Sequence, residues 1–573
     1  MGSGPIHTFT YRLIYYIICI SSIIRSHNVG QEVPYMIQKV VRTVDFPIVQ
    51  TRQGKLHGFL KGDVYHFQGI RYGTADRFEL PRPVQPWEGV KDAKSYGYIC
   101  PLMPEGMEGQ ASTVHDPNAE HNPMAAPFSS FEMQHRYWVM DEDCLFLNIW
   151  TKHLAGQEEH REERPVMLWL HGGGYAAGSS IEIPAYDGHN LADFGDVVVV
   201  SINHRLNCLG FLDLSSFGEE FKYSGICGMA DIVLALQWIH ENIAAFGGDP
   251  GNVTVAGQSG GGGKAVNLLQ MPPADGLYQK IVSQSGAARN RPHMTEESEK
   301  RRFQLLGEKT AQLLGLTKET IGQIRTVPYE DLSKAAEKAG QELQYPPGLM
   351  LFEPSPTPGW YTGLYNYAGF REETRDVPVM AGTVLGEFNF MHYLGDKTLI
   401  SAEKRNSLLQ DAYGPDTEAV LENFRRVYPK MDELYALSLD TVFRPGTVAF
   451  LDARTAFTDA PCYNYQMCFI IPYLGGVAPW HCACIPFVFR NVEMEEAHCT
   501  GSGIYAERVQ EEVSRAWISF METGDPSTSQ LVWSPYTAKE RCRMEFSEES
   551  RLTESPDDEL LSLIKKHRPV FID

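Results

Sequence analysis

Cysteine is scarce in this chain, with 11 residues among 573. That proportion excludes a disulfide-rich scaffold, and the odd number leaves at least one thiol without a partner in the same chain. Proline and glycine, with 35 and 51 residues, are too few for a collagen-like or low-complexity chain. Hydrophobic residues make up 43% of the sequence, so a large core can form and wholesale disorder is excluded.

Basic residues are also in deficit. The 50 lysines and arginines face 72 aspartates and glutamates, which gives a formal net charge of −22. A surface of that sign repels phosphate backbones, so we expect no nucleic-acid partner. The sequence does not indicate the oligomeric state.

No stretch approaches the length of about 20 apolar residues that a stable membrane span needs. Residues 13–24 are apolar and have the length of a signal-peptide core, but they contain two tyrosines and two serines and no clear cleavage site follows. We interpret residues 1–40 as an N-terminal extension, which is either signal-like or the product of a misplaced start. A cytoplasmic location is favoured, with secretion as the alternative if residues 1–35 act as a signal peptide.

The middle of the chain alternates strand and helix patterns. Residues 197–203 predict a buried parallel strand, and residues 231–245 predict a helix because their apolar positions recur every three or four residues. A short strand at 253–256 precedes a glycine-rich turn and a helical run at 264–269. This order predicts an α/β fold with a mostly parallel central sheet and helices on both faces.

The glycine-rich turn contains Gly257-Gln258-Ser259-Gly260-Gly261, which fits the pattern G-x-S-x-G. A serine on a sharp turn from strand to helix is pushed out of the sheet, and the flanking glycines tolerate the close approach of backbones. A phosphate-binding loop would need glycine at position 258 and serine or threonine at position 265, but the chain has Gln258 and Ala265. We therefore interpret Ser259 as a nucleophile.

A second glycine motif, His171-Gly172-Gly173-Gly174, follows the apolar strand pattern at 166–170. Loops of this type supply backbone amides to a developing oxyanion. We predict that the N–H groups of Gly173, Gly174 and Gly260 form an oxyanion hole for acyl transfer.

With these motifs the chain resembles the type-B carboxylesterases, the family of the cholinesterases and the bacterial para-nitrobenzyl esterases. The resemblance covers roughly residues 46–565. It includes the segments 67–70, 142–150, 203–206, 246–250 and 523–526, which have the sequences FQGI, EDCLFLNIW, NHRL, FGGDP and TGDP.

The resemblance also implies the remaining members of a Ser–Glu–His triad. The segment 382–387 (GTVLGE) is similar to the family's acid segment, which implies Glu387 as the acid. The segment 476–481 (GVAPWH) is similar to its histidine segment, which implies His481 as the general base. In such a triad the histidine takes the proton of the serine and the acid holds the imidazole in place.

The family implies one α/β-hydrolase domain over residues 41–573, with helical cap insertions at roughly 290–375. It implies a serine esterase that cleaves small-molecule carboxylic esters through an acyl-serine and needs no cofactor. A non-catalytic binding or adhesion protein on the same fold, like the neuroligins, is the alternative, since a fold does not fix a function. The complete triad favours catalysis.

Some residues depart from the family pattern or leave alternatives open. The family usually has glutamate before the nucleophile and alanine after it, where this chain has Gln258 and Gly260. We expect the loss of that negative charge to weaken any preference for cationic esters. Cys100 and Cys144 occupy positions that form a disulfide in secreted members, and here they are either paired or simply buried. We expect no metal site, because Cys482-Ala483-Cys484 lacks the usual zinc spacing.

Overall fold

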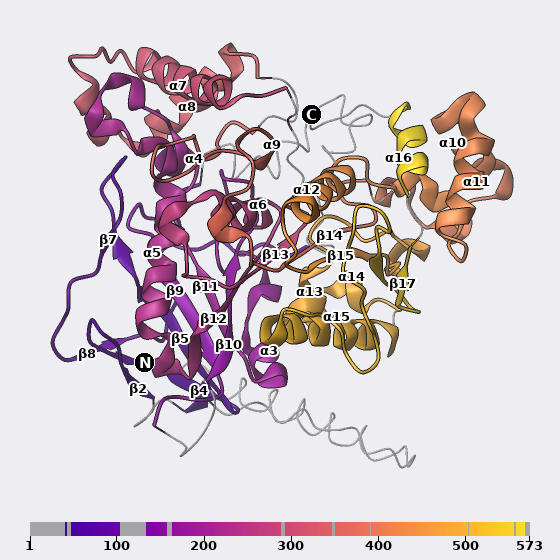
Figure 1. The fold of residues 1–573 in the computed structure, drawn as a ribbon, viewed down its shortest axis with the longest axis horizontal. Helices are drawn as coiled ribbons and strands as arrows, with labels where there is room; N and C mark the ends of the chain where they lie inside the picture. The colour runs from indigo at the N-terminus through magenta and orange to yellow at the C-terminus, as the bar shows by residue number, and fades with distance from the viewer. Residues whose placement is uncertain are drawn as a thin grey trace, which may run out of the picture. The chain divides into compact units, whose positions relative to one another are not determined.

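A mixed β-sheet of 12 strands forms the centre of the molecule (Figure 1). The computed structural model that shows it describes residues 41–42, 47–102, 133–156, 163–287, 291, 293–345, 350–389, 391–501, 504–554 and 557–567. Residues from Val41 onward form one compact unit. The predicted extension at residues 1–40 lies outside the described residues.

The central strands β11 to β16 pair in parallel, whereas the strands toward both edges pair antiparallel. This arrangement confirms the predicted α/β class. The sheet order is β1 (Val41–Arg42), β4 (Phe59–Lys61), β5 (Val64–Arg71), β9 (Phe146–Thr151), β11 (Val198–Ile202), β10 (Arg164–Leu170), β12 (Gly248–Gln258), β13 (Lys280–Gln284), β14 (Val379–Val384), β15 (Cys462–Met467), β16 (Arg543–Phe546), β17 (Arg551–Thr553). Two small sheets contain β2 (Ile48–Gln50), β3 (Lys55–His57) and β8 (Val90–Asp92), and β6 (Gly73–Thr74) with β7 (Arg82–Pro83).

Both faces of the sheet are buried because successive side chains of a strand point to opposite faces. In β10, Val166, Leu168 and Leu170 belong to one apolar cluster, and Met167 and Trp169 belong to the other. Each cluster is closed by helices, as a parallel sheet requires. The first cluster includes side chains of α5 (Cys227–Asn242) and α6 (Gly260–Asn267), and the second includes those of α3 (His189–Gly195), α13 (Ile485–Phe489) and α15 (Ile504–Thr523).

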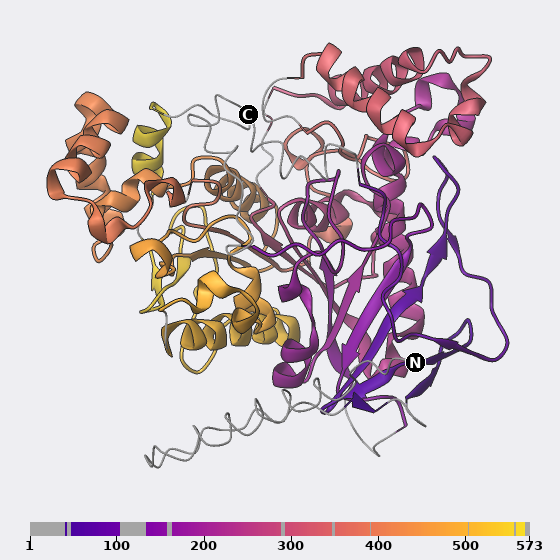
Figure 2. The same cartoon turned by 180° about the vertical axis from the view of Figure 1, so that it is seen from behind.

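The remaining helices extend the two apolar clusters outward. Figures 1 and 2 show the pair α7 (Glu296–Leu313) and α8 (Tyr329–Glu342) well apart from the pair α10 (Ala402–Tyr413) and α11 (Thr417–Val427). Helices α7 and α8 lie within the predicted insertion at 290–375. The other helices are α4 (Asn207–Phe211), α9 (Tyr365–Ala368), α12 (Phe443–Phe457), α14 (Glu496–Cys499) and α16 (Asp558–Lys565). In the part of the chain that the structure describes, no helix is long and apolar enough to cross a bilayer.

Two predicted elements differ from the structure in their limits. The helix predicted at 231–245 begins at Cys227 and ends at Asn242, and the strand predicted at 253–256 extends over the 11 residues of β12. The helix starts one turn before Asp231, which lies inside it. Its carboxylate is fully buried inside α5, where it accepts hydrogen bonds from Arg205.

The ion pair of Arg205 and Asp231 joins three segments of the core. Arg205 Nε and Nη2 donate to the two carboxylate oxygens at 2.9 and 2.7 Å, and Nη1 donates to the backbone oxygens of Asp76 and Glu79. Both side chains are buried, with exposures of 3% and 0%. A buried pair of this kind holds its elements together only while both charges are present.

Cys100 and Cys144 are buried free thiols. Their proximity is evident in the pKa of Cys144, which the neighbouring Cys100 thiol and burial raise well above its ordinary value.

We expect Asp231→Asn to lower the free energy of unfolding by about 3–5 kcal/mol, because it leaves the Arg205 charge buried and unpaired. Chemical denaturation measures this loss. Glu330→Gln, which breaks the exposed pair with Lys334 on α8, is the matched control and should leave the denaturation midpoint unchanged. Equal midpoints for Asp231→Asn and wild type would show that the buried pair does not stabilise the fold.

Candidate active site

Ser259 is the single residue between the end of β12 and the start of α6. Its backbone has φ 55° and ψ −126°, a conformation that only a tightly constrained turn imposes on a serine. The glycines around it are needed for space: a Cβ on Gly261 would lie 1.9 Å from the backbone oxygen of Leu170. The G-x-S-x-G motif thus forms the sharp strand-to-helix turn that the sequence predicts.

Glu387 and His481 are hydrogen-bonded through their backbones as well as through their side chains. Glu387 follows β14, and the N–H of His481 donates to the backbone oxygen of Glu387 at 2.8 Å. Just before these residues, the N–H of Gly386 donates to the backbone oxygen of Pro479 at 3.1 Å. The two segments that the family resemblance implies, 382–387 and 476–481, therefore lie side by side.

The carboxylate of Glu387 has a hydrogen-bond donor for each oxygen. His481 Nδ1 lies 2.5 Å from Oε2, and Oε1 accepts from Ser285 Oγ at 2.7 Å and from the N–H of Val384 at 3.0 Å. Glu387 and His481 are 1% and 4% exposed. Since a carboxylate accepts the Nδ1 proton, neutral His481 has its lone pair on Nε2, as a general base requires.

Ser285 is a residue of the site that the sequence analysis missed. It follows β13, which lies between β12, the strand that ends just before Ser259, and β14, the strand that precedes Glu387. The signal that could have indicated it is positional, because polar residues at the carboxyl ends of neighbouring parallel strands meet at one edge of the sheet.

His481 Nε2 faces Gln258 instead of the serine. The Gln258 amide nitrogen lies 3.1 Å from it, and the amide oxygen of Gln258 accepts from Cys482 Sγ at 3.0 Å. Among the described residues, no hydrogen bond joins His481 to Ser259. The sequence analysis treated Gln258 only as the loss of a negative charge, so this contact was not predicted.

Two aromatic rings pack against the imidazole. The centroid of Phe388 lies 4.4 Å from that of His481 with an interplanar angle of 28°, and that of Phe443 lies at 4.8 Å with 32°. The two phenyl rings lie 5.9 Å from each other, centroid to centroid, so they pack against the imidazole from neighbouring directions and limit its rotation.

The predicted oxyanion loop lies directly against the turn at Ser259. Gly173 and Gly174 have φ of 79° and 65°, and a Cβ on Gly260 would lie 2.0 Å from the backbone oxygen of Gly174. The amides of Gly173 and Gly174 donate to no group among the described residues, and the amide of Gly260 is at the first position of α6, where an intrahelical acceptor is lacking. Three N–H groups are thus left for a ligand close to Ser259.

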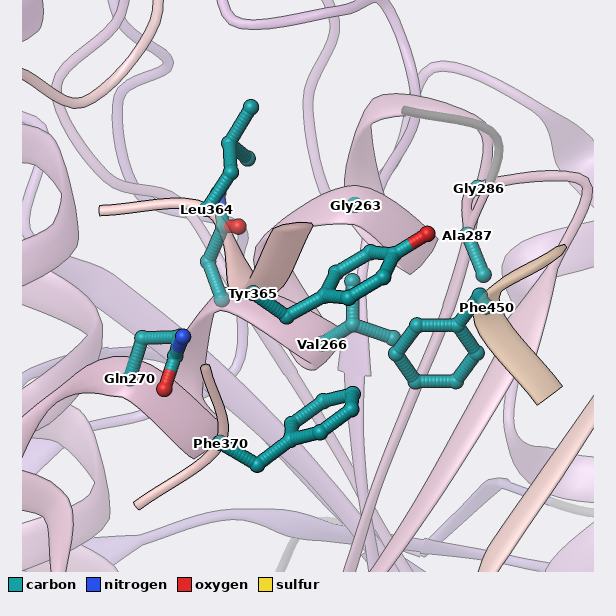
Figure 3. Close-up of a pocket in the computed structure, with 10 residues that line it drawn as sticks. Gly263, Val266, Gln270, Gly286, Ala287, Leu364, Tyr365, Phe370 and Phe450 are labelled. Carbon is teal, nitrogen blue, oxygen red and sulfur yellow. The ribbon is translucent and has the colours of Figure 1, made fainter. Parts of the chain in front are cut away.

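Two cavities of the structure are not lined by the predicted triad. Figure 3 shows an apolar cavity of about 20 Å³ beside α6, where Tyr365 stacks on Phe370 at 5.1 Å with Val266 and Phe450 around them. That volume is room for about one water molecule. A second cavity, of about 460 Å³, is lined by Tyr428, Cys468 and Glu545 among others. Ser259, Glu387 and His481 line neither of them.

In the segments that the structure describes, no three acidic, cysteine or histidine residues are grouped as a metal site would need. The two cysteines of the C-x-C segment contact glutamine side chains instead: Cys482 donates to Gln258, and Cys484 donates to Oε1 of Gln284 at 3.2 Å.

Comparison with known proteins gives one family. The carboxylesterase family model matches residues 45–563. The para-nitrobenzyl esterase of Bacillus subtilis (strain 168) is 31% identical over 523 residues, which cover 89% of this chain and 97% of that protein.

Solved structures agree with this match. An esterase from the anaerobe Clostridium hathewayi superimposes with a TM-score of 0.81 and 36% identity, covering 92% of this chain and all of that one. A thermophilic PNB esterase has a TM-score of 0.67 and 29% identity, over 90% of this chain and 99% of that one. These relatives are esterases, so the neuroligin-like alternative is not favoured. The chain belongs to the carboxylesterase family and is a serine hydrolase of carboxylic esters with the α/β-hydrolase fold.

Proposed function

We propose that Ser259 is the nucleophile of this esterase, that His481 is its general base and acid, and that Glu387 orients His481. The observation that carries this proposal is the buried hydrogen bond of 2.5 Å between His481 Nδ1 and Glu387 Oε2. This hydrogen bond leaves Nε2, the basic nitrogen, on the opposite side of the ring. Nε2 contacts Gln258, the residue directly before Ser259.

In the first half of the reaction Ser259 Oγ attacks the carbonyl carbon of the ester, and its proton passes to His481 Nε2. The negative charge that develops on the carbonyl oxygen is stabilised by the amides of Gly173, Gly174 and Gly260. The tetrahedral intermediate collapses as the imidazolium returns the proton to the departing alkoxide, which leaves as an alcohol. Water then attacks the acyl-serine with His481 as base, and the carboxylic acid and free Ser259 are released.

The substrates we propose are neutral esters with an aromatic or apolar group. Gln258 carries no charge that would attract a cationic alcohol, and Phe388 and Phe443 provide aromatic surface at His481. Met350 supports the same preference, since a Cβ on Gly174 would lie 2.3 Å from its methyl carbon, which puts an apolar side chain at the oxyanion loop. The esterase from Clostridium hathewayi is described as able to hydrolyse aliphatic aromatic polyesters.

The test of the proposal is hydrolysis of para-nitrophenyl esters from acetyl to long acyl chains by wild type and Ser259→Ala. We expect wild type to turn over and the variant to lose at least about 10⁴ in kcat, because the nucleophile is gone. Circular dichroism establishes that the variant is folded. Comparable activity in a folded Ser259→Ala would refute the assignment.

We expect Ser285→Ala to lower kcat by about 10- to 100-fold, because a charged carboxylate loses one hydrogen bond. KM should stay near the wild-type value, since Ser285 contacts Glu387 and not the ester. Ser283→Ala is the matched control: its hydroxyl is buried in β13 and has no hydrogen-bond partner among the described residues. If both variants lose activity to the same extent, Ser285 does not act through Glu387.

We expect Gly173→Ala to lower kcat by about 10²–10³, the usual effect of losing one oxyanion donor. A Cβ there would lie 2.3 Å from the backbone oxygen of Ala177, so the loop must move. Gly276→Ala has a similar positive φ of 75° with no atom within 4 Å and should keep wild-type kcat. Wild-type kcat in Gly173→Ala would exclude this loop from the oxyanion hole.

A further inference from the structure

Gln258 is fully buried, and its amide lies between the two consecutive residues His481 and Cys482. The amide nitrogen is 3.1 Å from His481 Nε2, and the amide oxygen is 3.0 Å from Cys482 Sγ. The backbone on the other side leaves little room, because a Cβ on Gly172 would lie 3.1 Å from the same oxygen. The side chain therefore has one orientation that satisfies both of its ends.

The direction of each hydrogen bond follows from its neighbours. Glu387 accepts the Nδ1 proton of His481, so Nε2 carries a lone pair and needs a donor, which the Gln258 –NH₂ group supplies. Burial raises the pKa of Cys482 well above its ordinary value. Its sulfur is thus a protonated thiol that donates to the Gln258 oxygen. Cys482, Gln258, His481 and Glu387 thus form one continuous chain of hydrogen bonds.

These hydrogen bonds use the nitrogen that the reaction needs. His481 Nε2 can accept the proton of Ser259 only when its lone pair is released by Gln258. The chain also opposes protonation of the ring, because an imidazolium would direct an N–H toward the –NH₂ group of Gln258. A glutamate in place of Gln258 would do the reverse, since its carboxylate would accept that N–H.

We infer that Gln258 is a positioning residue that holds the Nε2 lone pair of His481 in the resting enzyme and releases it to Ser259 Oγ when an ester binds, with Cys482 fixing the orientation of the amide. The inference rests on the proposed function, in which His481 is the general base. It adds that the Gln258 amide competes with Ser259 for this lone pair until the ester binds.

Other titratable groups lie around these four residues, and two of them, Asp440 and Glu182, are unchanged in all the variants below. Asp440, at the start of α12, is buried beside Glu387, and burial and that carboxylate raise its pKa to about 7. Glu182, in the loop after β10, lies near Cys482, and burial raises its pKa to about 7. Cys484 completes the set, and burial raises its pKa too. Because Asp440 and Glu182 both have a pKa of about 7, the pH profile of wild type alone does not identify the group that titrates. The difference between the profiles of two variants does.

The experiment compares the pH profiles of kcat/KM for a para-nitrophenyl ester in wild type, Gln258→Glu and Gln258→Met. The acid limb is the part of the profile where kcat/KM falls toward low pH. In the Gln258→Glu profile we expect this limb to move to higher pH by at least about one unit, because the carboxylate stabilises the imidazolium. In Gln258→Met, which is of similar length and has no donor, we expect a shift of about half a unit in the same direction. A role limited to packing would lower the plateau without moving the limb.

Cys482 gives a second test that leaves Gln258 in place. Cys482→Ala removes the donor to the amide oxygen, so the amide loses its fixed orientation and the limb should move in the same direction as in Gln258→Met. Cys482→Ser restores a donor and should return the limb to the wild-type position. Cys484→Ala is the matched control, because it removes a similar thiol–amide contact, with Gln284, that does not reach His481. Its limb should match wild type.

The outcomes separate this inference from the proposed function. If Ser259→Ala is inactive and the limbs of Gln258→Glu, Gln258→Met and Cys482→Ala all coincide with wild type, Gln258 does not hold the lone pair, and the triad assignment stands. Equal shifts in Cys482→Ala, Cys482→Ser and Cys484→Ala would also overturn the inference. A folded Ser259→Ala that retains activity would refute the proposed function itself.

Discussion

Four neighbouring parallel strands, β12 to β15, set the positions of the groups in the site. Ser259, Ser285 and Glu387 follow β12, β13 and β14, and the segment with His481 follows β15. The register is continuous across them, with Gln258 opposite Gln284, Gln284 opposite Gly382 and Gly382 opposite Tyr465. Because parallel strands present their carboxyl ends at one edge, residues more than 200 positions apart in sequence meet there.

The site is held in place at a conformational cost. Ser259, Ser285, Glu387 and Cys482 all have positive φ, between 45° and 79°, although none is glycine. Such residues cost about 1–3 kcal/mol each and persist only where the surroundings determine them strongly. Here the surroundings are two apolar clusters that fix the sheet, the buried pair of Arg205 and Asp231, and the backbone hydrogen bonds that join 386–387 to 479–481. The hydrogen bonds of Glu387 likewise offset the burial of its carboxylate.

The sequence predicts the parts of this arrangement that depend on local chemistry. A strand, a glycine-flanked serine and a helix in succession are enough to predict the turn at Ser259, and periodicity predicts β11 and most of α5. Glu387 and His481 came from the family resemblance, because nothing local distinguishes them among the 72 acidic residues and 18 histidines.

What the sequence could not indicate depends on tertiary contact. The start of α5 was misplaced because the charged residue Asp231 is buried inside the helix, where it pairs with Arg205 across the core. Ser285 and the contact of Gln258 with His481 arise only when the sheet register and the 476–482 loop bring distant segments together. The pairing state of Cys100 and Cys144 was open for the same reason.

The central claim is that an acyl group is transferred to Ser259. The direct measurement is to label the active enzyme with a fluorophosphonate, a covalent analogue of the ester, and to identify the modified peptide by mass spectrometry. The account predicts one adduct per chain, on Ser259, formed as esterase activity is lost. An adduct on another residue, or loss of activity with Ser259 unmodified, would contradict it.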